Sequence, residues 1–209
     1  RFESRGLGDV YKRQDKTAII CGQTEWTYKA FDTACNQLAR HLLARGISAG
    51  DKIAVIARNS HGFAAIRFAI ARIGAVLVPI NFMLNANEVR YILNSSRSKM
   101  LALGPEFIDI GLEAISKGTD IEITLGLPSE HQSSSLKTDL RFEGLLTGDA
   151  TAPEIHLDDR SLAQIVYTSG TEAMPKGAML SHSAVLWQYT SCIIAVSYTH
   201  LRAHETRTY

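Results

Sequence analysis

Cysteine and proline are scarce in this chain of 209 residues, which has three of the first and five of the second. The cysteines, Cys21, Cys35 and Cys192, are far apart and form no C-x-x-C pair, so the sequence predicts neither a zinc site nor a disulfide framework. We expect them to be reduced core thiols of a cytoplasmic protein. A run of about 18 apolar residues is also lacking, which argues against a membrane-spanning helix.

An excess of charge of either sign is missing too. The chain carries 22 Lys and Arg against 21 Asp and Glu, a formal net charge of +1. This balance gives no electrostatic reason to expect nucleic acid or an anionic membrane as a partner. A hydrophobic fraction of 45% and a charged fraction of 21% are typical of a globular protein, and the length allows one domain with a sizeable core.

Both ends of the chain look foreign to the rest. Residues 1–14 do not begin with Met, and the last residues interrupt the apolar pattern that precedes them. Both strings resemble the translated adapter or assembly junctions found at the ends of metagenomic gene fragments. The sequence therefore predicts a non-native leader at 1–14, a natural segment at 15–196 and a non-native tail at 197–209. On this interpretation the His200-x-x-x-His204 spacing, which could otherwise suggest a metal site, has no catalytic meaning.

Short apolar strands alternate with amphipathic helices along the chain. Thr27 is a suitable N-cap for a helix that ends before Gly46, and Asn85-x-x-Glu88 has the spacing of a capping box. The expected helices cover about 28–45, 60–73, 85–95 and 105–117, and the expected strands about 53–57, 76–78, 100–103, 121–124 and 163–167. Residues 127–139 are expected to form a polar loop. After the last strand, Ser181 or Ser183 is expected to cap a further helix with the apolar face Val185, Leu186, Tyr189, Cys192 and Ile193. The alternation predicts an α/β fold in which a parallel sheet is flanked by helices on both faces.

Residues 165–177, Ile-Val-Tyr-Thr-Ser-Gly-Thr-Glu-Ala-Met-Pro-Lys-Gly, are the most informative segment for chemistry. Hydroxyl side chains surround a glycine and one lysine follows: Thr168, Ser169, Gly170, Thr171 and Lys176. Uncovered backbone N–H groups in such a segment bind anions, and a lysine adds a point charge for a phosphate. The segment also follows an expected strand, and open α/β sheets bind ligands at the carboxyl ends of their strands. The pattern therefore predicts a polyphosphate site, although a Ser/Thr/Gly cluster is more often only a turn.

The P-loop of nucleoside triphosphatases is the obvious competing motif. Its form, G-x-x-x-x-G-K-[ST], requires a second glycine where this chain has Pro175 and a hydroxyl residue where it has Gly177. Proline has no N–H group to donate to a phosphate. A P-loop phosphotransferase is therefore the least favoured alternative.

The segment instead resembles the phosphate-loop signature of the adenylate-forming enzymes, the superfamily of acyl-CoA synthetases, adenylation domains and luciferases. That signature is [YF]-T-S-G-T-[TE]-G-x-P-K-G, and ten of the eleven positions from Tyr167 to Gly177 fit it, with Ala173 as the exception. The resemblance extends over 15–196 and is strongest to the fatty-acyl-CoA synthetases around 81–93. It implies the amino-terminal subdomain of that fold, in an incomplete form.

The resemblance implies ATP-dependent activation of a carboxylic acid, with a fatty acid as the expected substrate. The acid and ATP, with Mg²⁺, would give an acyl-adenylate, which coenzyme A would convert to a thioester. By the same resemblance Lys176 would be catalytic, Thr168 would lie near Mg²⁺, and the nucleotide would be bound by Thr168, Ser169, Gly170, Thr171, Glu172, Lys176 and Gly177. Glu172 brings a negative charge toward phosphates, so its side chain must turn away or face a metal ion.

Other parts of the family's apparatus do not appear in the sequence. We find no aromatic-Gly-x-Thr-Glu segment for adenine, no later ribose-binding Asp and no carboxy-terminal domain with its adenylation lysine. We therefore expect this polypeptide to be catalytically inert and prone to aggregate when it is alone. A module that loads an acid onto a carrier protein and a nucleotide-binding protein without ligase activity both stay open as alternatives. The acyl chain length and the oligomeric state cannot be derived from these residues.

Overall fold

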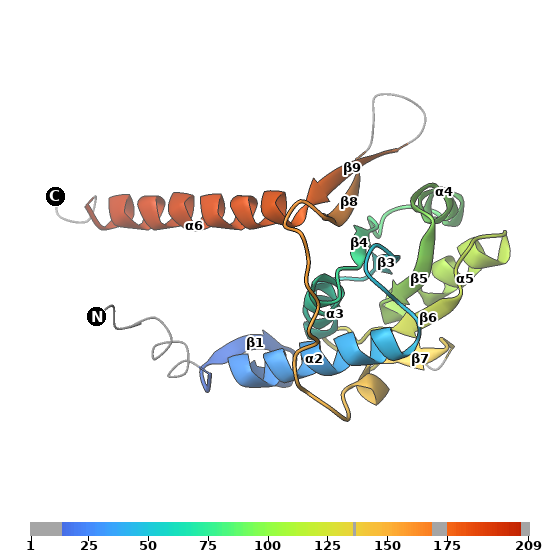
Figure 1. Ribbon diagram of the computed structural model, residues 1–209, viewed down its shortest axis with the longest axis horizontal. Helices are drawn as coiled ribbons and strands as arrows, with labels where there is room; N and C mark the ends of the chain where they lie inside the picture. Colours follow the sequence, from blue (N-terminus) through green and yellow to red (C-terminus); the bar gives the residue numbers. More distant parts are fainter. Residues whose placement is uncertain (1–13, 136, 169–174, 206–209) are drawn as a thin grey trace.

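The computed structural model describes residues 14–135, 137–168 and 175–205, and its main feature is a layered α/β arrangement (Figure 1). A seven-stranded sheet has the order β7-β6-β5-β3-β4-β8-β9. Helices α2 and α3 cover one face of this sheet, and α4 and α5 cover the other. The predicted α/β architecture with helices on both faces is confirmed.

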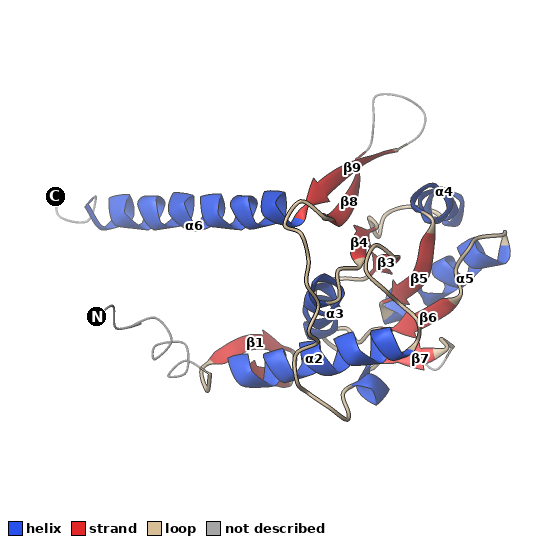
Figure 2. Ribbon diagram, in the orientation of Figure 1, coloured by secondary structure: helices blue, strands red, loops and turns tan. Residues whose placement is uncertain are grey.

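The elements follow one another along the chain in the order that the figures label (Figure 2). The strands are β1 Thr17–Cys21, β2 Thr24–Thr27, β3 Lys52–Ile56, β4 Val76–Pro79, β5 Ser98–Leu103, β6 Ile123–Gly126, β7 Leu140–Arg141, β8 Leu162–Thr168 and β9 Lys176–Ser181. The helices are α2 Tyr28–Ala44, α3 His61–Arg72, α4 Ala86–Ser96, α5 Ile108–Ser116 and α6 His182–Glu205, with short 3₁₀ turns η1 Pro105–Phe107 and η2 Phe142–Leu145.

The ends of the helices are set by the residues that the sequence indicated. The side chain of Thr27 caps α2 by accepting a hydrogen bond from the Ala30 N–H at 3.1 Å. At the start of α4 the Asn85 side chain accepts from the Glu88 N–H, and Glu88 accepts from the Asn85 N–H at 2.8 Å, which completes the capping box. Gly46 follows α2 with a φ of 77°, a left-handed conformation that glycine adopts without steric cost.

Two hydrophobic cores lie on opposite faces of the sheet because successive strand residues point in opposite directions. In β3, Ile53 and Val55 face α2 and α3, whereas Ala54 and Ile56 face α4 and α5. All four of these side chains are fully buried. This two-sided burial explains why the central strands consist of continuous apolar runs rather than alternating ones.

The sheet is parallel, as expected, except at one edge. β3 pairs in parallel with β4 and β5, and β4 pairs in parallel with β8, but β8 and β9 are antiparallel. The sequence did not indicate strand β9, which lies between the signature and the expected helix. An antiparallel partner can follow through a short connection, while a parallel one would need a crossover of a dozen or more residues.

Other elements were not anticipated from the sequence. β1 and β2 form a separate antiparallel hairpin whose two-residue turn begins with Gly22 at a φ of 58°. The expected loop at 127–139 is confirmed at its described positions, but β7 and the turn η2 follow it. Phe142 in η2 is almost fully buried and completes the core beneath α2 and α3.

Helix α6 extends away from the rest of the molecule (Figure 1). Of the two expected caps, Ser181 and Ser183, it is Ser181 that accepts a hydrogen bond from the Ala184 N–H, at 3.2 Å. The apolar face expected on this helix is largely uncovered, since Leu186 and Ile193 are 62% and 67% exposed. Over the described residues, none of the helices combines the length and the apolar character needed to cross a membrane.

Candidate functional site

The two flanks of the signature are the two strands of the β8–β9 hairpin. Thr168 ends β8 and Lys176 begins β9, and the two residues are direct cross-strand partners. Both are exposed. Residues that are eight positions apart in the sequence are thereby brought side by side at one end of the hairpin.

The remaining predicted site residues lie outside the described part of the chain. They are Ser169, Gly170, Thr171 and Glu172, together with Ala173. Their assignment to nucleotide binding stays a prediction. The described portion of the site consists of Thr168, Lys176 and Gly177, and the first two of these carry polar side chains that suit an anion.

The hairpin end that carries Thr168 is at the carboxyl edge of the sheet. β8 runs parallel to β4, so Thr168 is on the same edge as the segment that leaves β4 after Pro79. This is the edge at which open α/β sheets bind ligands. A hydroxyl group and an ammonium group placed opposite each other there can together bind an oxyanion.

Gly177 faces Tyr167 across the hairpin, one pair away from Thr168 and Lys176. A Cβ atom at residue 177 would lie 2.8 Å from Cγ2 of Ile165 and 3.1 Å from Cζ of Tyr167. The backbone of Gly177 is outside the left-handed region, so close packing rather than conformation requires a glycine here. The Tyr167 hydroxyl donates a hydrogen bond to Oγ of Ser95, in α4, at 3.0 Å.

The junction between α6 and the rest of the molecule has its own polar contacts. The guanidinium of Arg67, in α3, lies over the ring of Tyr189 at 5.7 Å from the ring centroid and also donates a hydrogen bond to its hydroxyl. Nε2 of His182 is buried nearby without a hydrogen-bond partner among the described residues. These residues hold the start of α6 against α3.

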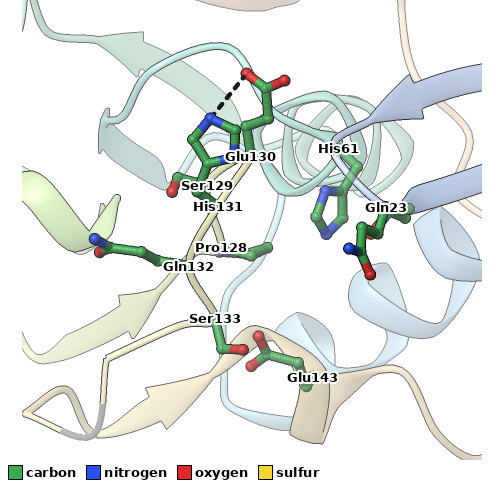
Figure 3. A pocket seen from close by; sticks show the side chains of 11 residues that line it. Gln23, His61, Pro128, Ser129, Glu130, His131, Gln132, Ser133 and Glu143 are labelled. Carbon is green, nitrogen blue, oxygen red and sulfur yellow. Dashed lines mark ion pairs between the residues drawn. The ribbon is translucent and has the colours of Figure 1, made fainter.

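A hollow of about 520 Å³ is lined by the β1–β2 turn, the start of α3, the loop that follows β6, and Glu143 (Figure 3). His61 and Gln23 lie on one side of it, and His131 and Gln132 on the other. Burial lowers the pKa of His61, although the Glu143 carboxylate acts in the opposite direction. Sequence reasoning did not find this hollow because its lining comes from a turn, a helix start and a loop that are far apart in the chain.

The polar lining of this hollow does not identify a ligand. His61 packs edge-on against Trp26 and Phe142, with ring centroids 5.1 Å and 5.9 Å away. Its Nδ1 atom is buried and has no hydrogen-bond partner in the described structure. No group of three or more His, Cys, Asp or Glu residues suited to a metal ion occurs among the described residues. We therefore regard His61 as part of an aromatic core cluster.

Comparison with known proteins gives consistent results. The profile of the AMP-binding enzyme family matches residues 8–209. The chain is 32% identical over 175 residues to 4-hydroxybutyrate–CoA ligase 2 of Metallosphaera sedula, covering 81% of this chain and 32% of that protein. It is also 32% identical over 166 residues to the fatty acid–[acyl-carrier-protein] ligase ScoC of Streptomyces coeruleorubidus, covering 79% and 30%.

The solved structures agree on the fold. A benzoate CoA ligase from Burkholderia xenovorans LB400 superimposes with a TM-score of 0.72 at 19% identity, over 84% of this chain and 33% of that one. The chain spans about a third of the length of the curated relatives that it matches. The family profile covers nearly the whole chain, and it agrees with the resemblance that the 167–177 signature carries. This chain is a member of the AMP-binding enzyme family.

Proposed function

We propose that this chain is the amino-terminal portion of a ligase that activates a carboxylic acid with ATP and transfers the acyl group to coenzyme A. The observation that carries the proposal is the hairpin in which Thr168 stands opposite Lys176 at the carboxyl edge of the sheet. The hairpin belongs to a chain of the AMP-binding family. A fatty acid is the proposed substrate, because residues 81–93 resemble the fatty-acyl-CoA synthetases.

In the first proposed step, a carboxylate oxygen of the acid attacks the α-phosphorus of ATP. The bond from that phosphorus to the bridging oxygen breaks, and pyrophosphate leaves with its electron pair. Negative charge accumulates on the leaving group, so a fixed ammonium and fixed hydrogen-bond donors lower the barrier. Lys176 and Thr168 are proposed for this role, with Ser169, Gly170 and Thr171 completing the loop. In the second step the coenzyme A thiolate attacks the acyl carbon and AMP leaves.

Magnesium is the metal that such a reaction requires. Mg²⁺ is usually held by one or two protein oxygens together with substrate phosphates, rather than by a cage of protein ligands. The exposed Thr168 hydroxyl would suit that mode, since it provides a side-chain oxygen at the described end of the hairpin. Bound there, the metal would neutralise phosphate charge.

Replacement of Lys176 tests the proposal in the whole ligase that contains this segment. We expect Lys176→Ala to slow acid-dependent exchange between ATP and pyrophosphate tenfold or more, because one charge-assisted hydrogen bond contributes about 1.5–3 kcal/mol. Lys137→Ala is the matched control, since this lysine is 62% exposed and pairs with Asp109 on the surface. Unchanged exchange in Lys176→Ala would remove Lys176 from the site.

Loading of an acid onto a carrier protein is the second candidate function. It shares the adenylation step and differs only in the thiol that attacks the adenylate. One relative of this chain is named as a ligase for an acyl-carrier protein and another as a CoA ligase. A direct competition between coenzyme A and a phosphopantetheinylated carrier protein would separate the two, with thioester formed on CoA expected to dominate.

The isolated chain of 209 residues is proposed to be inactive, since the adenine, ribose and adenylation-lysine segments of the family do not occur in its sequence. Pyrophosphate exchange with a panel of carboxylic acids should stay at background with this polypeptide alone. Exchange above background would show that residues 1–209 suffice for catalysis.

A further inference from the structure

We propose that Tyr167, Gly177 and Ser95 form a hairpin anchor that positions Thr168 and Lys176 for the reaction. This inference rests on the proposed function, because the reaction gives the positioning its consequence. The side chains of Tyr167 and Ser95 do not bind phosphate in this proposal. They act by fixing the register and the place of the hairpin end.

The register of the hairpin determines where the Lys176 side chain points. Side chains alternate between the faces of a strand, so a slip of one residue in β9 would turn Lys176 to the opposite face. The pair Tyr167–Gly177 directly precedes the pair Thr168–Lys176. A contact that fixes the register of Tyr167 and Gly177 therefore also fixes the register of Thr168 and Lys176.

Close packing over the glycine fixes the first pair. The Tyr167 ring and the Ile165 side chain lie so close to Gly177 that a Cβ atom there would approach them within 3.1 Å and 2.8 Å. An aromatic side chain over a glycine on the neighbouring strand is a recognised way of holding register in antiparallel pairs. A shifted register would bring a residue with a side chain into this space, since Lys176 and Ala178 flank the glycine.

The Tyr167 hydroxyl then connects the hairpin to a rigid helix. It donates to Oγ of Ser95 at 3.0 Å, and Ser95 lies near the end of α4. Helix α4 buries Val89, Ile92 and Leu93 in the same core that contains Ile165. Thr168 is exposed, so it has no buried side chain of its own to hold it. The anchor links this exposed residue to the core through its immediate neighbour.

The test uses Tyr167→Phe, Ser95→Ala and the double variant in the whole ligase. We expect each single change to lower kcat for acid-dependent ATP–pyrophosphate exchange roughly three- to tenfold, with KM for ATP changed less than about twofold. The double variant should be no slower than the slower single variant, because both changes remove the same bond. Conversion of preformed acyl-adenylate by coenzyme A should be unaffected, since no triphosphate is present in that step.

Two further variants complete the design. Gly177→Ala should lower exchange more than tenfold, because the added methyl group has to displace the Tyr167 ring or Ile165. Ser116→Ala is the matched control, because its hydroxyl donates to a carbonyl within its own helix α5. It should leave both half-reactions unchanged.

Several outcomes would overturn the inference. One is an unchanged exchange rate in the single variants. Another is a double variant whose loss of rate equals the product of the two single losses, because the two changes would then act independently. Equal losses in both half-reactions would also overturn it, because they would indicate general destabilisation. A wild-type ligase that shows no exchange with any acid would instead overturn the proposed function, and the positioning role would fall with it.

Discussion

Two regions of the molecule have similar apolar patterns: the body, residues 28–145, and the arm, residues 176–205. Apolar side chains are buried in the body, whereas several described ones in the arm are exposed. Helix α2 in the body buries Leu38 and Leu42 completely against the sheet. In the arm, Met179 of β9 is 73% exposed and Trp187 of α6 is 71% exposed. Lys176 and Gly177, the last two residues of the signature, begin the arm.

The comparison shows what an amphipathic pattern determines. The spacing of apolar residues on α6 predicted a buried face, and the helix does form with its predicted cap. Burial is a property of the surroundings, however, and the contacts of α6 include β8, β9, the segment before β8 and Arg67. A pattern therefore locates an apolar surface without identifying what covers it.

Thiol alkylation provides the largest expected difference between the two regions. Cys35 in the body is fully buried, and burial raises the pKa of its thiol to about 12, whereas Cys192 in the arm is exposed. Cys35 can react only after the body opens, so we expect Cys192 to react with iodoacetamide roughly 1,000-fold faster. Mass spectrometry of the labelled peptides measures both rates. With Cys192→Ser as control, fast labelling of Cys35 would contradict a stably closed body.

Truncation of apolar side chains gives the next largest difference. Leu38→Ala in the body should lower the free energy of unfolding by about 2–5 kcal/mol, because it leaves a cavity in a packed core. Ile193→Ala in the arm should change it by less than about 0.5 kcal/mol, since this side chain is 67% exposed. Urea denaturation followed by fluorescence measures both values. Equal effects would mean that α6 is packed in solution.

Much of the body was predictable because its signals are local. Thr27 caps α2 and the Asn85–Glu88 box starts α4, and each signal lies within four residues of the group that it binds. The β1–β2 hairpin was missed although its two-residue turn carries a glycine, because its strands are short and half-exposed. β9 was missed because its sequence, Lys-Gly-Ala-Met-Leu-Ser, has little intrinsic strand preference.

The candidate site was predictable in composition but not in geometry. The signature predicts that Thr168 and Lys176 bind an anion, and the structure adds that the two residues are opposite each other. That pairing depends on the hairpin, which in turn depends on Tyr167 packing over Gly177. The contact with Ser95 could not be foreseen, since it joins residues far apart in sequence through tertiary packing.

Helix caps sharpen the comparison on a smaller scale. Asn85→Ala in the body should cost about 1 kcal/mol of global stability, because the capping box of α4 is lost. Ser181→Ala removes the cap of α6, and we expect it to fray the start of this helix locally. The global free energy of unfolding should change by less than half of the loss expected for Asn85→Ala. Hydrogen exchange resolved by segment separates the two effects. A global loss from Ser181→Ala would show that the arm and the body unfold together.

Acid dependence gives the smallest expected effect. The Asp139 carboxylate accepts hydrogen bonds from Oγ1 and N–H of Thr124 at 2.7 Å and 2.8 Å, and these bonds lower its pKa below the ordinary value of 3.8. Its contribution to stability is therefore present above pH 3.8 and is lost as the pH falls through the lower pKa of the folded state. Asp139→Asn should make the free energy of unfolding depend less on pH in this range. Urea denaturation at a series of pH values from about 2 to 5, the range in which carboxyl groups titrate, measures this dependence. An unchanged curve would mean that Asp139 makes no such contribution.

The strand order of the main sheet has a consequence for biosynthesis. β4 has β3 on one side, but its other neighbour is β8, which leaves the ribosome only after β5, β6 and β7 have been made. A nascent chain therefore presents one open β4 edge throughout that interval, and open edges invite pairing with foreign strands. We expect chaperone occupancy on translating ribosomes to be highest between the emergence of Val76–Pro79 and that of Leu162–Thr168.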